Sequence, residues 1–241
     1  MIYQADMTQK LMAVIGMRKL LSIETSPPIQ AVIDANLIPV FIEMLHHEIP
    51  KFQFESAWCL TNIASGTTEH VNSLIEKNVL NHFNMLLQST HIEVVEQVIW
   101  GIGNIAGDSP TTRNRVIESG ALDSISRVLQ QAPAGTSFMR NASWALSNLC
   151  RGRPQPDYNL VKGAIPTLIK VLVENDKEDI ITDVCWALSY LSDGAKERVN
   201  DLLQPNLLKK VISLLEHEQV SIAIPCLRTI GNIVTGDDSQ T

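Results

Sequence analysis

The sequence predicts an all-α protein whose short helices stack into a right-handed superhelical solenoid. Three observations support this. Apolar helical segments recur at a nearly constant interval, and a tryptophan–asparagine pair recurs at the same interval. The chain of 241 residues is 45% hydrophobic and 19% charged, so it can bury a sizeable core and does not have the composition of a disordered chain. An internal repeat of this size overrides the usual relation between chain length and domain number.

The first set of repeated positions consists of apolar segments that each end in a leucine. These leucines are Leu45, Leu87, Leu129, Leu172 and Leu215, at intervals of 42, 42, 43 and 43 residues. Nine residues before each leucine stands an asparagine or a glycine: Asn36, Asn78, Gly120, Gly163 and Asn206. Both residue types tolerate a left-handed backbone at a helix end. A sharp turn is therefore predicted at the same place in every unit.

The second set is a row of aromatic residues, interrupted once by an arginine. Its members are Trp58, Trp100, Trp144, Trp186 and Arg228. The fourth residue after each is an amide, or in one unit a phenol: Asn62, Asn104, Asn148, Tyr190 and Asn232. Residues four apart lie on one face of a helix, so each unit presents both side chains on one stripe. Stacking the units is expected to make that stripe continuous.

Each unit reads as a short helix, a turn, a middle helix and a longer helix, as in 28–34, 38–46 and 52–64. Three helices in about 42 residues is the armadillo pattern among helical repeats. The whole chain, 1–241, is therefore expected to be one armadillo-repeat domain. Its predicted parts are a partial first repeat at 1–25, with a helix at 6–22, and full repeats at 26–66, 67–108, 109–153, 154–194 and 195–238. Two additional residues between Trp100 and Trp144 are assigned to the loop at 130–137.

The tryptophans could belong to the core or to a ligand-binding face. A single tryptophan on a helix is usually core, but here each shares its face with a polar residue, and an asparagine is costly if buried unpaired. The residues beside each indole are small or apolar and can pack inward instead. We therefore predict a solvent-lined groove. Asparagine amides can bind the main chain of an extended peptide, and parallel indoles can hold the stems and cations of lysine and arginine.

Acidic residues are expected at the edges of this groove. They are Asp108, Asp179, Asp183, Asp193, Asp237 and Asp238. Taken singly, each is most simply a solvated surface charge. Asp108 differs, because the other units have glycine at that register: Gly66, Gly152, Gly194 and Gly236.

Composition and spacing argue against several other functions. The net charge of −7 disfavours nucleic acid as a partner and favours a basic one. The chain has no run of 18 apolar residues and no secretory leader, so no membrane role is expected. The four cysteines are widely separated and are read as reduced, buried thiols, and the six histidines show no metal-ligand spacing. We expect no metal, no cofactor and, without a nucleophile–base pair, no enzymatic activity.

Several segments of the chain resemble the importin-α family, the adaptors that recognise nuclear localisation signals. The similar segments are RKLLSIETSPPI, QFESAWCLTNIASGT, GNIAGD, ASWALSNLCR, CWALSYLSDG and LRTIGNIVTGDD. The irregular units also agree, since the family has a Trp/Tyr unit followed by an Arg/Asn unit. The resemblance implies cytoplasmic and nuclear localisation and a Lys/Arg-rich peptide as ligand.

The resemblance also implies a set of peptide-binding residues. The main site would comprise Trp58, Asn62, Gly66, Gln97, Trp100, Asn104, Asp108, Trp144 and Asn148. Asp108 would accept the key lysine ammonium beside the carbonyl of Gly66. Arg151, Asp183, Trp186 and Tyr190 would continue the groove, and Arg228 and Asn232 would begin a secondary site.

Three departures from the family limit what the resemblance implies. Val71 replaces a threonine that helps to hold the lysine, so the pocket is expected to lack one hydroxyl. No basic importin-β-binding arm precedes Met1, so importin-β is a partner only if the full protein has such an arm. The later repeats are also missing, and self-association through exposed ends of the solenoid is expected. The alternative function is a structural armadillo scaffold that binds another protein through its convex face or its ends.

Overall fold

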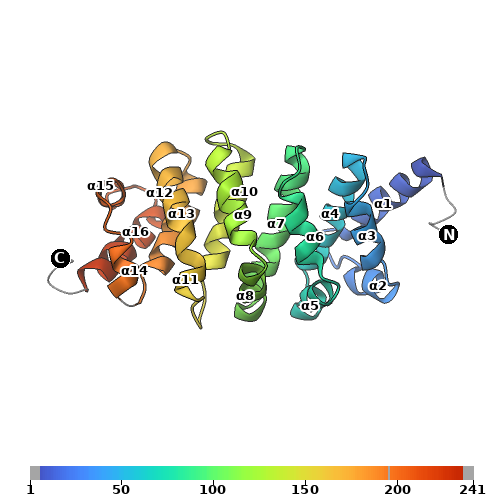
Figure 1. The fold of residues 1–241 in the computed structure, drawn as a ribbon, viewed down its shortest axis with the longest axis horizontal. Helices are drawn as coiled ribbons and strands as arrows, with labels where there is room; N and C mark the ends of the chain where they lie inside the picture. Colours follow the sequence, from blue (N-terminus) through green and yellow to red (C-terminus); the bar gives the residue numbers. More distant parts are fainter. Residues whose placement is uncertain (1–5, 195, 236–241) are drawn as a thin grey trace. The chain divides into compact units, whose positions relative to one another are not determined.

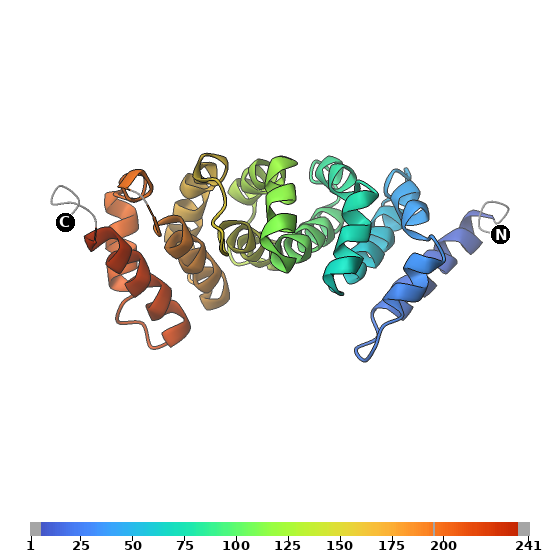
Figure 2. The same ribbon diagram turned by 90° about the horizontal axis from the view of Figure 1, so that it is seen from below.

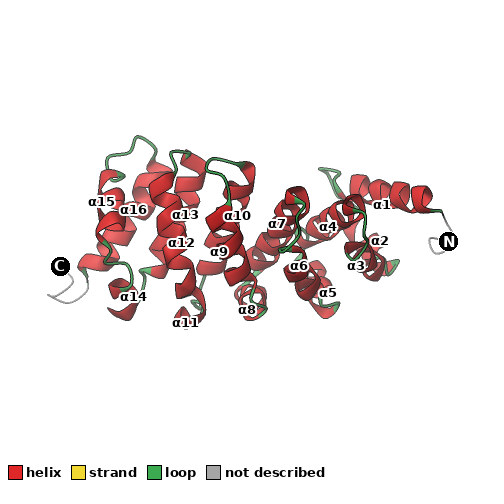
Figure 3. Ribbon diagram, turned by 45° about the horizontal axis from the view of Figure 1, so that its top comes forward, coloured by secondary structure: helices red, strands yellow, loops and turns green. Residues whose placement is uncertain are grey.

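The structure is a computed structural model that describes residues 6–194 and 196–235. Within these ranges every regular element is a helix (Figure 3). The chain divides into two compact units, residues 1–112 and 113–241, and the division falls within α8 (Pro110–Glu118). Among the described helices, none combines the length and the apolar character that crossing a membrane requires.

The first unit contains three long helices with shorter ones between them. Its helices are α1 (Met7–Leu21), α2 (Ile29–Asp34), α3 (Ile38–Leu45), α4 (Pro50–Ala64), α5 (Thr68–Glu76), α6 (Val79–Leu86) and α7 (Ile92–Asp108). We call α1, α4 and α7 the third helices of this unit, because α4 and α7 each close a predicted set of three and α1 is the long helix of the partial first repeat. They pack in the order α1, α4, α7, with α4 in contact with both neighbours (Figure 1).

The second unit repeats this arrangement. Its helices are α9 (Ala121–Gln131), α10 (Ser137–Cys150), α11 (Tyr158–Val161), the 3₁₀ helix η2 (Lys162–Ala164), α12 (Ile165–Glu174), α13 (Glu178–Leu191), α14 (Lys196–Asn200), α15 (Pro205–Ser213) and α16 (Val220–Val234). The third helices here are α10, α13 and α16, and α13 packs against the other two (Figure 2). Each unit is therefore built by laying similar long helices side by side.

The core of each unit lies on the faces that the third helices turn toward one another and toward the shorter helices. In α4, Ala57, Cys59 and Ile63 are fully buried, and in α7 Ile99 and Ile102 are. All four cysteines are free thiols and buried, as predicted. Burial of apolar surface, at roughly 25 cal/mol per Å², is what holds one repeat on the next.

The helix assignments made from sequence are confirmed where they were specific. The predicted helix at 6–22 is α1, whose N-terminus is closed by a capping box between Asp6 and Gln9. The predicted helices at 28–34, 38–46 and 52–64 correspond to α2, α3 and α4 within two residues. The end of the last predicted repeat, with Gly236, Asp237 and Asp238, lies outside the described residues.

The predicted turns are confirmed in three units and wrong in two. Asn36, Asn78 and Gly120 have φ of 53°, 59° and 81°, so each is left-handed. Gly163 instead belongs to η2, which runs directly into α12. Asn206 lies inside α15, because the proline before it occupies the first helical position, where its fixed φ and missing N–H are tolerated. At Gly163 a 3₁₀ helix therefore replaces the expected turn, and at Asn206 the helix α15 has already begun.

The third helices approach closely at Gly101 of α7. A Cβ atom there would lie 2.7 Å from Thr61 Oγ1 and 2.7 Å from Phe83 Cε2, and both residues are buried. The Thr61 hydroxyl is itself held, since it donates to the carbonyl of Gln97 at 3.2 Å. Glycine is therefore required for packing at this position, in spite of its poor helix propensity.

We predict that Gly101→Ala lowers the free energy of unfolding by about 1–3 kcal/mol, because overpacking exceeds the gain of about 1 kcal/mol in helix propensity. The matched control is Gly16→Ala in α1, where no atom lies within 4 Å of the added Cβ. That change should stabilise the protein. Urea titrations followed by far-UV circular dichroism measure both effects, and equal stability changes for the two variants would contradict the packing argument.

Candidate functional site

The four tryptophans lie on third helices and outside the core. Trp100 is 45% exposed, and Trp58, Trp144 and Trp186 are half-buried. The residues beside each indole in sequence are buried. A stripe of aromatic surface is thus left on one face of α4 and α7, and another on α10 and α13.

The asparagines that share this face bind the preceding third helix or its end. Asn62 Nδ2 donates to Ser22 Oγ at 2.9 Å, and Asn104 Nδ2 donates to the carbonyl of Thr61 at 3.1 Å. In the second unit, Asn232 Nδ2 donates to Ser192 Oγ at 2.9 Å. The amide nitrogens therefore connect successive repeats. Asn148 departs from the expected solvent-lined position, since it is only 4% exposed.

The unit with a phenol in place of the amide forms an aromatic stack. The rings of Trp186 and Tyr190 are stacked, with centroids 5.8 Å apart and planes 26° apart. The guanidinium carbon of Arg228, from the next third helix, lies 5.4 Å from the centre of the Tyr190 ring. A cation of the chain itself thus occupies one face of the phenol.

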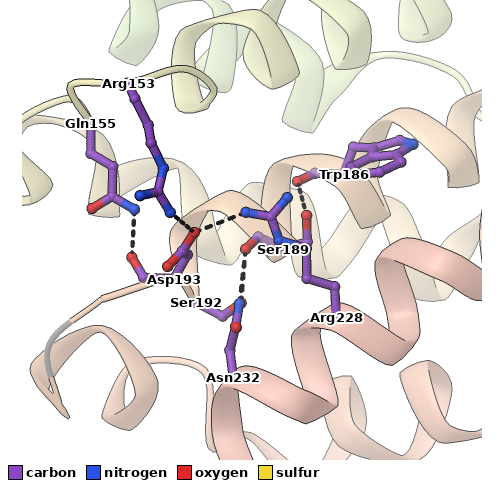
Figure 4. Close-up of polar contacts among 8 residues, drawn as sticks. All are labelled: Arg153, Gln155, Trp186, Ser189, Ser192, Asp193, Arg228 and Asn232. Atoms are coloured by element: carbon purple, nitrogen blue, oxygen red, sulfur yellow. Dashed lines mark hydrogen bonds and ion pairs between the residues drawn. The ribbon is translucent and has the colours of Figure 1, made fainter.

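Asp193 organises the polar contacts around this stack (Figure 4). Its Oδ2 atom accepts from Arg228 at 2.8 Å and from Arg153 at 3.4 Å, and its carbonyl accepts from Gln155 Nε2 at 2.8 Å. A hollow of about 330 Å³ opens here. It is lined by Cys150, Arg151, Gly152, Arg153, Gln155, Tyr190, Asp193 and Arg228. Two arginines on one carboxylate oxygen were not foreseen from sequence.

The segment that carries Arg151 is held by a buried arginine that sequence reasoning missed. Arg113 is 1% exposed and donates from Nη1 to the carbonyl of Arg151 at 2.6 Å and from Nη2 to that of Pro154 at 2.8 Å. Burial lowers the pKa of Arg113, although these carbonyls satisfy its donors. The Arg151 side chain itself is exposed.

Asp108 is the last residue of α7 and is half-buried. Its Oδ1 accepts from the Thr68 hydroxyl at 2.9 Å, and its Oδ2 from the Thr112 hydroxyl at 3.5 Å. The hydroxyls on Asp108 thus come from Thr68, at the start of α5, and from Thr112. Val71 lies in the same helix α5 and is fully buried.

Gly66, at the end of α4, is required by a histidine. A Cβ atom at Gly66 would lie 2.3 Å from His70 Nδ1. That nitrogen accepts from the backbone N–H of Thr67 at 3.1 Å, while Nε2 lies 3.1 Å from Gln30 Oε1. The backbone that would present the Gly66 carbonyl is thus fixed by a close imidazole contact.

Gln97 lies in α7 and is only 6% exposed, so its side chain is buried. Within the described residues its Nε2 has no hydrogen-bond partner. A buried amide without a partner costs about 1–3 kcal/mol.

Asp183 is the acidic residue with the most perturbed ionisation in the second unit. Burial raises its pKa to about 6, the neighbouring charge of Asp179 acts in the same direction, and Arg140 acts against both. Arg140 also forms an ion pair with Asp179 at 3.7 Å. Asp183 is therefore a carboxylate that a nearby cation would help to ionise.

The candidate residues fall into two groups, one in each compact unit. The first unit holds Trp58, Asn62, Gly66, Gln97, Trp100, Asn104 and Asp108, and the second holds Trp144, Asn148, Arg151, Asp183, Trp186, Tyr190, Arg228 and Asn232. The missed partners, such as Thr68, Ser22 and Arg113, each contact a residue 38 to 40 positions further along the chain. That separation is close to the repeat length of about 42 residues, so the repeat itself could have suggested which residues pair across neighbouring repeats. Among the described residues no group of three or more His, Cys, Asp or Glu side chains could hold a metal.

Comparison with known proteins identifies both the repeat and the family. The family model of the armadillo/beta-catenin-like repeat matches residues 25–65 and 155–193. The chain is 45% identical over its whole length to importin subunit alpha-1a of Oryza sativa subsp. japonica, of which it covers 45%. It is 52% identical over 222 residues to importin subunit alpha-B of Dictyostelium discoideum, covering 91% of this chain and 43% of that protein. The chain thus spans less than half the length of these relatives.

Solved structures agree on the fold. An engineered protein, 26% identical, superimposes with a TM-score of 0.85 over 97% of this chain and 95% of its own. A designed armadillo repeat protein in complex with the peptide (KR)4, 24% identical, has a TM-score of 0.84 over 96% of this chain and 95% of its own. The fold is therefore an armadillo solenoid, and by its sequence the chain belongs to the importin-α family.

Proposed function

We propose that this chain is a non-enzymatic binding module for extended Lys/Arg-rich nuclear localisation signals, and that it acts as a nuclear import adaptor shuttling between cytoplasm and nucleus. The observation that carries the proposal is the placement of the tryptophans on a face of the third helices outside the core. In the first unit, Asn62 and Asn104 share that face and bind the preceding repeat. The curated relatives are named importin subunits alpha, which supports the same function.

The chemistry of this face suits a basic peptide. An exposed indole such as that of Trp100 can lie along the aliphatic stem of a lysine or an arginine, and its π-face attracts the cation with about 0.5–1 kcal/mol. Asn62 and Asn104 use Nδ2 within the scaffold, so their Oδ1 atoms are suited to accept main-chain N–H groups of the peptide. The net charge of −7 attracts such a peptide from a distance.

Asp108 is proposed to accept a lysine ammonium. An ionised carboxylate has about four lone-pair positions, of which the hydroxyls of Thr68 and Thr112 use two. The remaining positions can accept charge-assisted hydrogen bonds, worth about 1.5–3 kcal/mol. The hydroxyls orient the carboxylate before the ligand arrives.

The test of the proposed function is titration of a fluorescently labelled peptide with four successive basic residues, against the same peptide with alanines in their place. Trp100→Ala should weaken binding of the basic peptide about five- to thirtyfold and cost at most about 1–2 kcal/mol of stability, since the indole is 45% exposed. The matched control is Phe83→Ala, which should cost about 3–5 kcal/mol of stability because that ring is fully buried. Equal binding of both peptides by the wild type would refute the function.

We predict that Asp108→Lys reduces the affinity for the basic peptide by at least tenfold, because it replaces the proposed ammonium acceptor by a like charge. The charge-matched control is Glu43→Lys on the exposed surface of α3, which should change the affinity by less than about threefold. Calorimetric titration measures both. Similar losses in the two variants would mean that only net charge matters.

The ionisation of Asp183 makes a prediction about pH. Burial raises the folded-state pKa of Asp183 to about 6 from an ordinary value of 3.8, so the folded protein favours the protonated carboxyl over the carboxylate. The contribution of Asp183 to folding stability is therefore fully present below pH 3.8 and is lost as the pH rises through 6. Asp183→Asn should therefore stabilise the protein by about 1–3 kcal/mol at pH 8 and by less at pH 5. The control is Asp176→Asn, an exposed carboxylate in the preceding loop. Thermal unfolding at the two pH values decides, and a gain at pH 8 no larger than at pH 5 would show that Asp183 is not desolvated.

We also propose that the chain self-associates through α16. Val220, Ile224, Leu227 and Val234 lie on one stripe of this helix and are 49–65% exposed. Sedimentation over a hundredfold range of concentration should show association, and Leu227→Glu should abolish it. A strict monomer throughout that range would contradict the proposal.

A further inference from the structure

We infer that Arg18 occupies the outer face of the Trp58 indole and thereby closes one end of the basic-peptide site. The inference rests on the proposed function, and it adds a residue of the chain itself that limits how many cations a peptide can place. All the residues involved lie in the first compact unit.

The position of Arg18 is that of a ligand cation. Its guanidinium carbon lies 4.7 Å from the centre of the Trp58 ring, a cation–π distance, and its side chain is only 20% exposed. Arg18 comes from α1, and α4, which carries Trp58, packs between α1 and α7. The covered face of the indole is therefore the one directed away from Trp100.

A buried carboxylate holds Arg18 in this position. Glu55, one turn before Trp58 and 1% exposed, accepts from Arg18 Nε at 2.7 Å and from Lys51 Nζ at 2.9 Å. Burial acts to raise the pKa of Glu55, but Arg18 and Lys51 together outweigh it, and the pKa is lowered. The carboxylate is thus ionised at neutral pH, and removing Arg18 would leave it with a single cation.

The indole is fixed from a second side. The Phe54 ring meets Trp58 edge to face, with centroids 5.5 Å apart and planes at 80°, and Lys51 Nζ lies 4.9 Å from the centre of the Phe54 ring. Trp58 can therefore neither swing away nor offer its outer face without breaking these contacts. A peptide cation would have to displace Arg18 and separate a largely buried ion pair, which is unfavourable.

The peptide site consequently begins at the inner face of Trp58. A basic residue added to a peptide beyond that point should find no indole face to bind. Removing the guanidinium should open one additional slot.

The experiment measures preference for an added basic residue. The basic peptide is lengthened by one Arg or one Ala, at each end in turn, and the ratio of the two affinities is determined calorimetrically for wild type, Arg18→Gln and Lys51→Gln. The last two variants lose the same charge and each removes one partner of Glu55, but only Arg18→Gln uncovers Trp58. We expect the preference for Arg over Ala at one end to rise about two- to fivefold in Arg18→Gln and to stay at the wild-type value in Lys51→Gln.

The outcomes separate the inference from the function on which it rests. An unchanged preference in Arg18→Gln, or an equal rise in Lys51→Gln, would overturn the inference while leaving peptide binding intact. Failure of the wild type to bind the basic peptide would refute both. If Arg18→Gln does not fold, Arg18→Lys keeps the ion pair but lacks the planar guanidinium, and it should show a smaller rise. Adding Trp58→Ala to Arg18→Gln should abolish the rise in preference for Arg over Ala.

Discussion

The contact between one third helix and the next is the constraint on which the rest of the structure depends. A repeat of about 42 residues cannot bury its apolar face alone, so each third helix must lie against a neighbour. Gly101 shows how closely this is enforced, since even a methyl group there would meet Thr61 and Phe83. The same contact leaves one face of each helix uncovered, and the indoles lie on that face. Each of these helices therefore has one face that packs in the core and another that belongs to the proposed binding surface.

Polar contacts follow the same spacing as the core. Asn62 binds Ser22, Asp108 binds Thr68, and Arg113 binds the Arg151 carbonyl. These partners are 38 to 40 residues apart, about one repeat. The residues proposed to hold a peptide are thus also residues that join one repeat to the next. Variants at these positions should be interpreted only with stability measured alongside binding.

The sequence predicted the periodic features and missed the local ones. Helix positions and the left-handed turns at Asn36, Asn78 and Gly120 follow from intervals and residue type. Gly163 and Asn206 do not form that turn, because Gly163 lies in a 3₁₀ segment that leads into α12 and Asn206 follows a proline that starts α15. The hydrogen bond from the Thr68 hydroxyl to Asp108 was not predicted, because it joins two residues 40 positions apart whose contact depends on how α5 packs beside the end of α7. The coverage of Trp58 by Arg18 depends on a buried ion pair, which no spacing rule reveals.

The use of one amide by two partners has a mechanical consequence. Asn104 already donates from Nδ2 to the Thr61 carbonyl of the preceding helix. A peptide N–H that donates to its Oδ1 would polarise the amide and strengthen the existing bond, since hydrogen bonds in a chain reinforce one another. Each peptide residue bound in this way would then strengthen the contact between two adjacent repeats. Within a unit, a loaded solenoid would be stiffer than an empty one, and the stiffness would grow with the number of asparagines engaged.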